Sequence, residues 1–410
     1  MGGERFTPYQ RKLFAFLSVA SFFEGFDFMA FGQVRPHLRA HWSLSESFAG
    51  NMYSVISLGT IAAYALVRLA DRVGRRPMLT ATIAGYTSFT FLSGLAPDPY
   101  TYTAVQALAR VFLVAEWAIS FVFAAEEFPA ARRGAVIGVI QACNAFGAIV
   151  CAGVAPLLVR APWGWRTVYL VAIPPLLLIM YARRGLRETR RFESERSAGH
   201  TGAQSLFRIF RTPHRRTVFK LAALWSLMYM SSNVAVAYWK DFAVTEAGLT
   251  DGEAGASIAI AAVASLPLVF VSGRLLDAIG RRHGGAVIFG VGALGTALCY
   301  TLDGRWPLTA TLVLGVFGAS AMPSVLNALT TEMFPTHMRA DAFAWCNNLL
   351  GRVGYVAAPA IVSNVADHVG ALGPVVAATA VFPLLAVALM YALLPETRGL
   401  ELERTSAVAG

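Results

Sequence analysis

Apolar stretches of about 20 residues recur along the entire chain and are separated by short polar segments. An α-helix rises about 1.5 Å per residue, so a stretch of this length crosses about 30 Å of hydrocarbon. The pattern predicts twelve transmembrane helices, near residues 13–34, 48–68, 77–96, 101–125, 135–159, 166–184, 216–239, 254–273, 284–302, 306–330, 340–363 and 371–394. These segments leave no room for a soluble domain.

The composition agrees with an all-α membrane protein. Of the 410 residues, 56% are hydrophobic and 14% are charged, which is too few charges to cover a soluble domain of this size. The first apolar segment contains Glu24 and Asp27, so we expect a retained helix and not a signal peptide. All cysteines lie in apolar segments and lack disulfide or zinc spacing: Cys143, Cys151, Cys299 and Cys346.

The net charge of +10 raises the question of nucleic-acid binding, and its distribution argues against it. If the N-terminus is cytoplasmic, the connections on that side hold 26 of the 34 Lys and Arg residues. This is the positive-inside bias, which predicts cytoplasmic termini in a plasma (inner) membrane. The arginine-rich connection 185–215 fits an orientation signal in contact with anionic lipids.

An internal repeat divides the chain. Residues 68–76 match residues 274–282 at an offset of 206, and the Glu-x-Phe-Pro turn that begins at Glu126 matches that at Glu332 at the same offset. A third match, shifted by two residues, pairs 186–190 with 394–398. Two motifs with one offset indicate duplication. The sequence thus predicts two six-helix halves, 1–184 and 216–410, joined by the linker 185–215.

The repeated Asp-Arg-x-Gly-Arg-Arg turn resembles the signature loop of the major facilitator superfamily. That loop opens with Gly, as at Gly273 in the second copy, whereas the first copy has Val67. The resemblance implies two pseudo-symmetric six-helix bundles with a substrate site between them near the bilayer midplane. It also implies cytoplasmic ion pairs that hold one conformation closed.

The residues expected to form these gating ion pairs recur in both halves. The alternative is that they only mark helix ends and orientation. They are Asp71, Arg75, Arg76, Glu126, Arg133, Asp277, Arg281, Glu332 and Arg339.

A narrower resemblance comes from the first and fourth predicted helices. The run from Glu24 to Gly32 resembles the patterns of metabolite:proton symporters and aromatic-acid:proton symporters. The run from Val114 to Trp117 stands where the former family has Gly-Gly-Glu-Trp. These resemblances imply proton-coupled transport of a small metabolite.

Charges inside a membrane are costly and commonly mark function. Helical rise places Glu24 about 16 Å and Asp27 about 21 Å from the cytoplasmic face, with Arg110 at a similar depth. Two acids beside one base cannot all stay ionised at low cost, so we expect Asp27 to carry the driving proton, assisted by Glu24 and Arg110. The alternative is a static ion pair. Glu116 fits gating or helix packing better.

Arg352 lies near the midplane on the eleventh predicted helix, about 18 Å deep. On a regular helix it shares one face with Trp345 and Asn348. An arginine without an acid on its own helix suits a carboxylate ligand by bidentate hydrogen bonding. The alternative is a structural partner for an acid in the other half.

Further polar candidates lie on the seventh and fifth predicted helices. Trp225, Tyr229 and Asn233 share a face, as do Gln141 and Asn144. We include all five in the predicted substrate site, although interhelical hydrogen bonding explains each amide equally well.

The sequence predicts a secondary transporter that imports a small organic acid or zwitterion with protons, by alternating access. Exporters, antiporters and facilitators of a drug or sugar remain alternatives, as does a membrane sensor. We expect no enzyme, because the chain has no Walker loop, metal spacing or nucleophile elbow. We also expect no cofactor, no nucleic-acid partner and a monomer.

Overall fold

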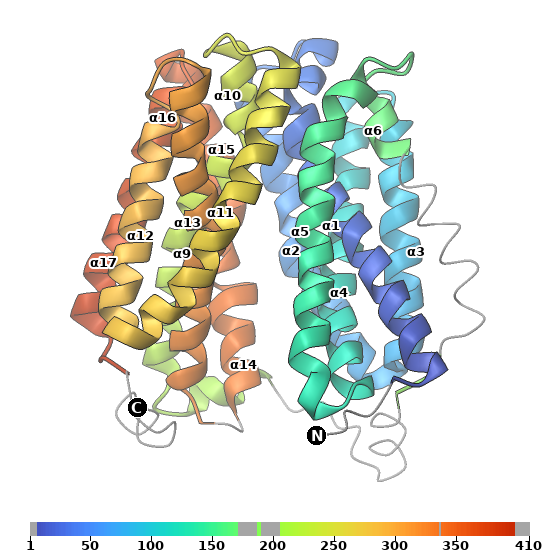
Figure 1. Cartoon of the computed structure of the whole chain (residues 1–410), viewed down its shortest axis with the longest axis vertical. Coiled ribbons are helices and arrows are strands. Elements are labelled where there is room, and N and C mark those ends of the chain that lie inside the picture. Colours follow the sequence, from blue (N-terminus) through green and yellow to red (C-terminus); the bar gives the residue numbers. More distant parts are fainter. Residues whose placement is uncertain (1–5, 171–186, 190–205, 336–337, 398–410) are drawn as a thin grey trace. The chain divides into compact units, whose positions relative to one another are not determined.

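A computed structural model describes residues 6–170, 187–189, 206–335 and 338–397 (Figure 1). Within these ranges the chain forms helices and connecting turns, without any β-strand. The helices of the first part of the chain are α1 Pro8–Trp42, α2 Glu46–Val73, α3 Arg75–Gly94, α4 Pro99–Glu127, α5 Ala130–Val159 and α6 Arg166–Leu170. Those of the second part are η1 Leu206–Arg211, α9 Arg215–Ala237, α10 Trp239–Thr245, α11 Asp251–Ile279, α12 Arg281–Leu298, α13 Arg305–Glu332, α14 Arg339–Phe343, η3 Ala344–Leu349, α15 Arg352–Val369, α16 Gly373–Ala378 and α17 Val381–Leu393.

Eight helical segments of the described chain are long and apolar enough to cross a membrane. Three further predicted segments coincide with the helices α3, α9 and α12. The predicted segment 166–184 is described only over the short helix α6, and its remainder lies outside the described residues. The all-α prediction is therefore confirmed, while the count of twelve crossings stays a prediction.

The chain folds into two compact units. The first unit comprises residues 1–34 and 55–203, and the second comprises residues 35–54 and 204–410. The C-terminal end of α1 and the N-terminal end of α2 are thus part of the second unit, whereas the rest of both helices is part of the first. Most of the predicted linker 185–215 lies outside the described residues.

Apolar side chains from α1, α3, α4 and α5 form the core of the first unit. Leu17, Leu79 and Ile140 are fully buried there, and Phe123 is inaccessible to solvent among them. Burial of aliphatic and aromatic side chains at close-packed density orders these helices against one another.

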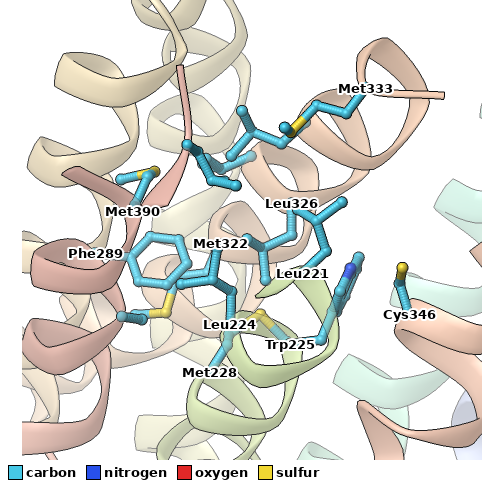
Figure 2. Close-up of a cluster of buried hydrophobic side chains, with 14 of the residues drawn as sticks. Leu221, Leu224, Trp225, Met228, Phe289, Met322, Leu326, Met333, Cys346 and Met390 are labelled. Atoms are coloured by element: carbon cyan, nitrogen blue, oxygen red, sulfur yellow. The ribbon is translucent and has the colours of Figure 1, made fainter. Parts of the chain in front are cut away.

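The core of the second unit brings α9, α12, α13 and α17 together (Figure 2). Phe289 of α12 lies beside Met322 of α13, and Leu224 of α9 and Met390 of α17 complete the cluster. Methionine is abundant here because its unbranched side chain fills irregular gaps between helices.

In the first unit, the repeated motif forms a turn between α2 and α3. Gly74 has a φ of 117°, which lets the chain reverse direction within a single residue. Arg75 lies 3.2 Å from Asp71 and 3.4 Å from Glu126, so it joins the ends of α2 and α4. The carboxylate of Glu188 accepts the backbone N–H of Arg75 at 3.0 Å and so occupies the N-terminus of α3, where the helix dipole favours an anion.

The second unit builds the same arrangement from the second copy of the motif. Arg281 lies 3.1 Å from Asp277 and 2.9 Å from Glu332. Glu396 accepts the backbone N–H groups of Arg281 and Arg282 at 2.9 and 3.0 Å, at the N-terminus of α12.

The threonine that follows each terminal glutamate completes the repeat. Thr189 donates to Glu126 at 2.5 Å, and Thr397 donates to Glu332. Glu188 and Thr189 of the first unit correspond to Glu396 and Thr397 of the second, which is the third match in the sequence with its shift of two residues. The internal repeat of the sequence is therefore a repeat of hydrogen bonds and ion pairs within each unit.

Gly280 occupies the turn of the second copy, and we predict that Gly280→Ala lowers the melting temperature of the purified protein. Its φ of 97° and ψ of 166° fall in a region that is essentially restricted to glycine, where another residue costs about 1–3 kcal/mol. An added Cβ would also lie 2.8 Å from a carboxylate oxygen of Glu396.

Gly290→Ala in α12 is the matched control, because a Cβ there meets no atom within 4 Å. Equal melting temperatures for the two variants would show that the turn does not require glycine.

Candidate functional site

The charged cluster of the first unit lies where α1 faces α4. Arg110 is buried, with its Cζ 4.7 Å from the ring centroid of Phe28, and it interacts electrostatically with Asp27. Asp27 is half-buried, whereas Glu24 is inaccessible to solvent. Within the described part of the chain, neither carboxylate oxygen of Glu24 has a hydrogen-bond partner. The predicted neighbours Asp27 and Arg110 therefore act on one another in the structure.

The remaining polar candidates of the first unit lie in different surroundings. Glu116 is inaccessible and accepts a hydrogen bond from Ser120 at 2.5 Å, one turn further along α4. Gln141 is exposed on α5, and Asn144 is half-buried where α5 passes close to α1 at Gly25. Their part in a substrate site stays a prediction.

Arg352 of the second unit lies between two tyrosine rings. Its Cζ is 5.1 Å from the ring centroid of Tyr229 and 5.0 Å from that of Tyr355. The two rings are perpendicular, with centroids 5.4 Å apart. A guanidinium over aromatic faces is attracted by the ring quadrupoles, which hold it without neutralising its charge.

Two amide side chains form hydrogen bonds with these tyrosines. The Tyr229 hydroxyl donates to Oδ1 of Asn347 at 2.8 Å, and Nδ2 of Asn233 donates to the Tyr355 carbonyl at 2.9 Å. The structure thus brings the predicted residues Tyr229, Asn233 and Arg352 together. The result is a cationic centre between two tyrosine residues, each of which is hydrogen-bonded to an amide side chain.

The assumption of a regular helix before Arg352 is wrong. Residues 344–349 form a π-helix, which inserts an extra residue per turn and changes the register of the preceding side chains. Asn347, and not the predicted Asn348, consequently hydrogen-bonds to α9. Trp345 packs against Phe207 and Phe210 of η1, with ring centroids 5.4 and 4.7 Å away.

Trp225 lies in the core of the second unit and connects two helices. Figure 2 shows this side chain within the apolar cluster. It is 1% exposed, and its Nε1 donates to the Thr330 hydroxyl of α13 at 3.1 Å. Its ring centroid lies 5.7 Å from that of Tyr229. Trp225 therefore packs against Tyr229, one of the two tyrosines beside Arg352.

The predicted gating residues divide into two groups. Asp71, Arg75, Glu126, Asp277, Arg281 and Glu332 form the ion pairs described above, and Arg76 contributes its backbone N–H to Glu188. Arg339 instead donates to the Phe334 carbonyl at 3.4 Å, and Nε of Arg133 has no hydrogen-bond partner among the described residues. All these ion pairs lie within one unit or the other, and whether they gate transport stays a prediction.

Known proteins resemble this chain over nearly its full length. A family model described as Major Facilitator Superfamily matches residues 17–359 and 221–408. The chain belongs to the major facilitator superfamily. It is therefore a multi-pass membrane protein of a transporter family, as the repeated motif predicts.

Individual proteins that resemble this chain share only a modest fraction of its residues. The probable 4-methylmuconolactone transporter of Cupriavidus pinatubonensis is 27% identical over 97% of this chain and 93% of its own length. The cis,cis-muconate transport protein of Acinetobacter baylyi is 28% identical over 88% of each chain. Among solved structures, a bacterial homolog of the human lysosomal transporter Spinster shares the fold with a TM-score of 0.77, 14% identity and 99% coverage of both chains.

Sequence reasoning missed a second set of charges in this major facilitator protein. Arg35, Arg39 and Glu46 belong to the part of α1 and α2 within the second unit. Both arginines pair with Glu46 and with Asp241 of α10. By the predicted segment boundaries these residues fall in connections outside the membrane, although α1 continues to Trp42. The spacing of four between the two arginines was the available signal, since it places both on one helix face.

We predict that Trp225→Phe lowers the melting temperature of the purified protein without ligand. The change leaves the Thr330 hydroxyl without its donor inside the core, a loss of about 1–3 kcal/mol. Trp306→Phe is the control, because Trp306 is 66% exposed on α13 of the same unit and its replacement should change little. An unaltered melting temperature with impaired transport would place Trp225 on the transport path instead.

Proposed function

We propose that the chain is a proton-coupled symporter that imports a small organic acid across the plasma membrane. In this proposal the positive-inside bias places both termini in the cytoplasm. The protein works as a monomer among anionic lipids, and the proton gradient supplies the energy for accumulation.

The observation that carries the substrate proposal is the surroundings of Arg352. Its guanidinium is held by Tyr229 and Tyr355, and in the described part of the chain no carboxylate forms a salt bridge with it. Arg352 is half-buried. A partly desolvated cation without an acid gains most from an anionic ligand, and the planar guanidinium can bind a carboxylate through two hydrogen bonds. Tyrosine rings beside it favour a substrate with an unsaturated or aromatic body.

The two relatives named above support the same class of substrate. One is described as a carrier of 4-methylmuconolactone and the other of cis,cis-muconate. Muconate is an unsaturated dicarboxylate, so its chemistry matches a site that combines one cation with aromatic rings and amides. We propose carboxylates of this kind as substrates of the present chain.

The coupling proposal rests on Asp27 and Arg110. The arginine stabilises the ionised carboxylate when the two are close, and their separation leaves a carboxylate in a poorly solvated place where protonation is favoured. Glu24, buried one turn away, assists by accepting the same proton. The alternative function, export of the substrate in exchange for protons, uses the same residues. The direction of gradient-driven substrate flux distinguishes import from export.

We predict that Asp27→Asn abolishes accumulation driven by a pH gradient but retains counterflow. Asparagine imitates the protonated carboxyl permanently, so the variant can bind substrate and change conformation without moving a proton. Proteoliposome uptake of labelled cis,cis-muconate, with and without an imposed pH gradient, measures both activities.

The Asp27→Glu variant is the control for this position, since it retains a group that can be protonated. Loss of accumulation and counterflow together, with poor folding, would indicate a static ion pair. Continued accumulation in a well-folded Asp27→Asn protein would move the proton site to Glu24 or Glu116.

We predict that Arg352→Lys reduces muconate uptake at least about tenfold while the amount of protein in the membrane stays constant. Lysine keeps the charge but loses the planar fork and the stacking on Tyr229 and Tyr355. Arg274→Lys, at the α11 end of the motif, is the matched conservative control. An unchanged apparent affinity in Arg352→Lys would exclude this arginine from the substrate site.

A further inference from the structure

Tyr355 differs from other buried tyrosines of the second unit in the bonding of its hydroxyl group. Tyr238 donates to the carbonyl of Pro359 at 3.1 Å, and Tyr300 donates to that of Ala235 at 2.9 Å. The hydroxyl of Tyr355 has no hydrogen-bond partner in the described part of the chain, although the residue is only 4% exposed. This polar group is therefore desolvated without a compensating bond, which is uncommon in a folded interior.

Shorter hydroxyl side chains of this unit bond to their own helix. Those of Ser272 and Thr379 donate to backbone carbonyls three residues earlier, at 2.7 and 2.6 Å. Tyrosine cannot do this, because its hydroxyl stands at the far end of a rigid ring. The hydroxyl of Tyr355 therefore needs a partner from another helix or from a bound molecule, and the described helices supply none.

The backbone that carries Tyr355 is held firmly against α9. Its carbonyl accepts from Nδ2 of Asn233 at 2.9 Å. A Cβ at the preceding residue, Gly354, would lie 2.1 Å from the carbonyl oxygen of Ser226, so only glycine permits α15 to approach α9 this closely. The position of the Tyr355 ring is thus fixed by its surroundings, and its unpaired hydroxyl is fixed with it.

Arg352 lies directly beside this tyrosine. The two residues are three positions apart on α15, so they share a helix face and are separated by a rise of about 4.5 Å. The Cζ of Arg352 is 5.0 Å from the Tyr355 ring centroid, and its Nε also has no hydrogen-bond partner among the described residues. One turn of α15 therefore combines a cation without an acid and a hydroxyl without a partner.

The neighbouring polar side chains already have partners within the protein. The Tyr229 hydroxyl donates to Oδ1 of Asn347 at 2.8 Å. The amide of Asn233 is bonded at both ends, since its Oδ1 accepts from the Tyr53 hydroxyl at 2.8 Å while its Nδ2 donates to Tyr355. Tyr229 and Asn233 thus hold the surroundings of Arg352 in place, whereas the hydroxyl of Tyr355 is left for a ligand.

We propose that the Tyr355 hydroxyl donates a hydrogen bond to a second oxygen acceptor of the substrate whose carboxylate binds Arg352. The inference rests on the proposed function and specifies the substrate class further. The substrate is a short organic acid that carries, several atoms from its carboxylate, a second carboxylate or a carbonyl oxygen. Tyr229 and Asn233 are positioning residues, which act through Arg352 and Tyr355.

An unpaired donor in a binding site selects strongly between similar substrates. A molecule with the second acceptor restores the hydrogen bond that the Tyr355 hydroxyl lacks in the unliganded protein. A molecule with an apolar group at that place leaves the hydroxyl desolvated and unpaired in the complex, so it binds less tightly. Arg352 therefore provides affinity for any small carboxylate, and Tyr355 distinguishes among them.

Two probes that differ at one end test this role. They are cis,cis-muconate and the corresponding monoacid, in which a methyl group replaces one carboxylate, and calorimetric titration of the purified protein gives both dissociation constants. The native protein should bind muconate at least about tenfold more tightly than the monoacid. In Tyr355→Phe the ratio of the two constants should fall by about tenfold, through weaker binding of muconate alone.

Two further variants and one measurement separate ligand binding from a structural role. Tyr391→Phe removes a hydroxyl from a 37% exposed tyrosine of α17 in the same unit and should leave both constants unchanged. Arg352→Lys should weaken both compounds, because both have the carboxylate that the guanidinium binds. Without ligand, Tyr355→Phe should melt no lower than the native protein, since the change breaks no hydrogen bond within the chain.

The possible failures are distinguishable. If the native protein binds muconate but Tyr355→Phe leaves the ratio of the constants unchanged, the role of Tyr355 is overturned and the proposed substrate class stands. A lower melting temperature of unliganded Tyr355→Phe would likewise overturn it, by showing that the hydroxyl has a structural partner. If the native protein binds neither compound, the proposed substrate class is refuted together with this inference.

Discussion

A charge in the interior of a membrane protein must find an opposite charge, an aromatic face or water, because hydrocarbon offers none of these. The structure meets this requirement differently at each site. Arg75 and Arg281 are paired with carboxylates at helix ends. Arg352 lies on tyrosine rings, and Arg110 lies on Phe28 with Asp27 nearby. Arg352 and Arg110 have incomplete charge compensation, and to these two we assign substrate binding and proton coupling.

The fold was largely predictable because two signals are strong in the sequence. Apolar stretches long enough to span a bilayer predict helices, and two motifs at one offset predict a duplicated architecture. The prediction extended to individual contacts, since Glu126 and Glu332 pair with the arginines of the two repeated turns. The side chains of the repeated motif form the same contacts in both units, so their repeated spacing in the sequence was enough to predict these contacts.

The candidate site was only partly predictable, because it depends on departures from regular helices. Asn348 was expected on one helix face with Arg352, but the π-helix over residues 344–349 changes that register, and Asn347 bonds to Tyr229. The 3.6-residue period of the sequence gives no indication of the π-helix. Arg35 and Asp241 are 206 residues apart, and each appears in sequence as an ordinary charge near a helix end. Only the folded chain shows that they are buried together.

The glutamate and threonine near the end of each unit close that unit in the same way. Glu396–Thr397 closes the second unit near the end of the chain, and Glu188–Thr189 closes the first unit with the same hydrogen bonds. The first unit therefore ends in the same contacts that end the second. A break in the polypeptide after Thr189 would leave these terminal contacts of both units intact.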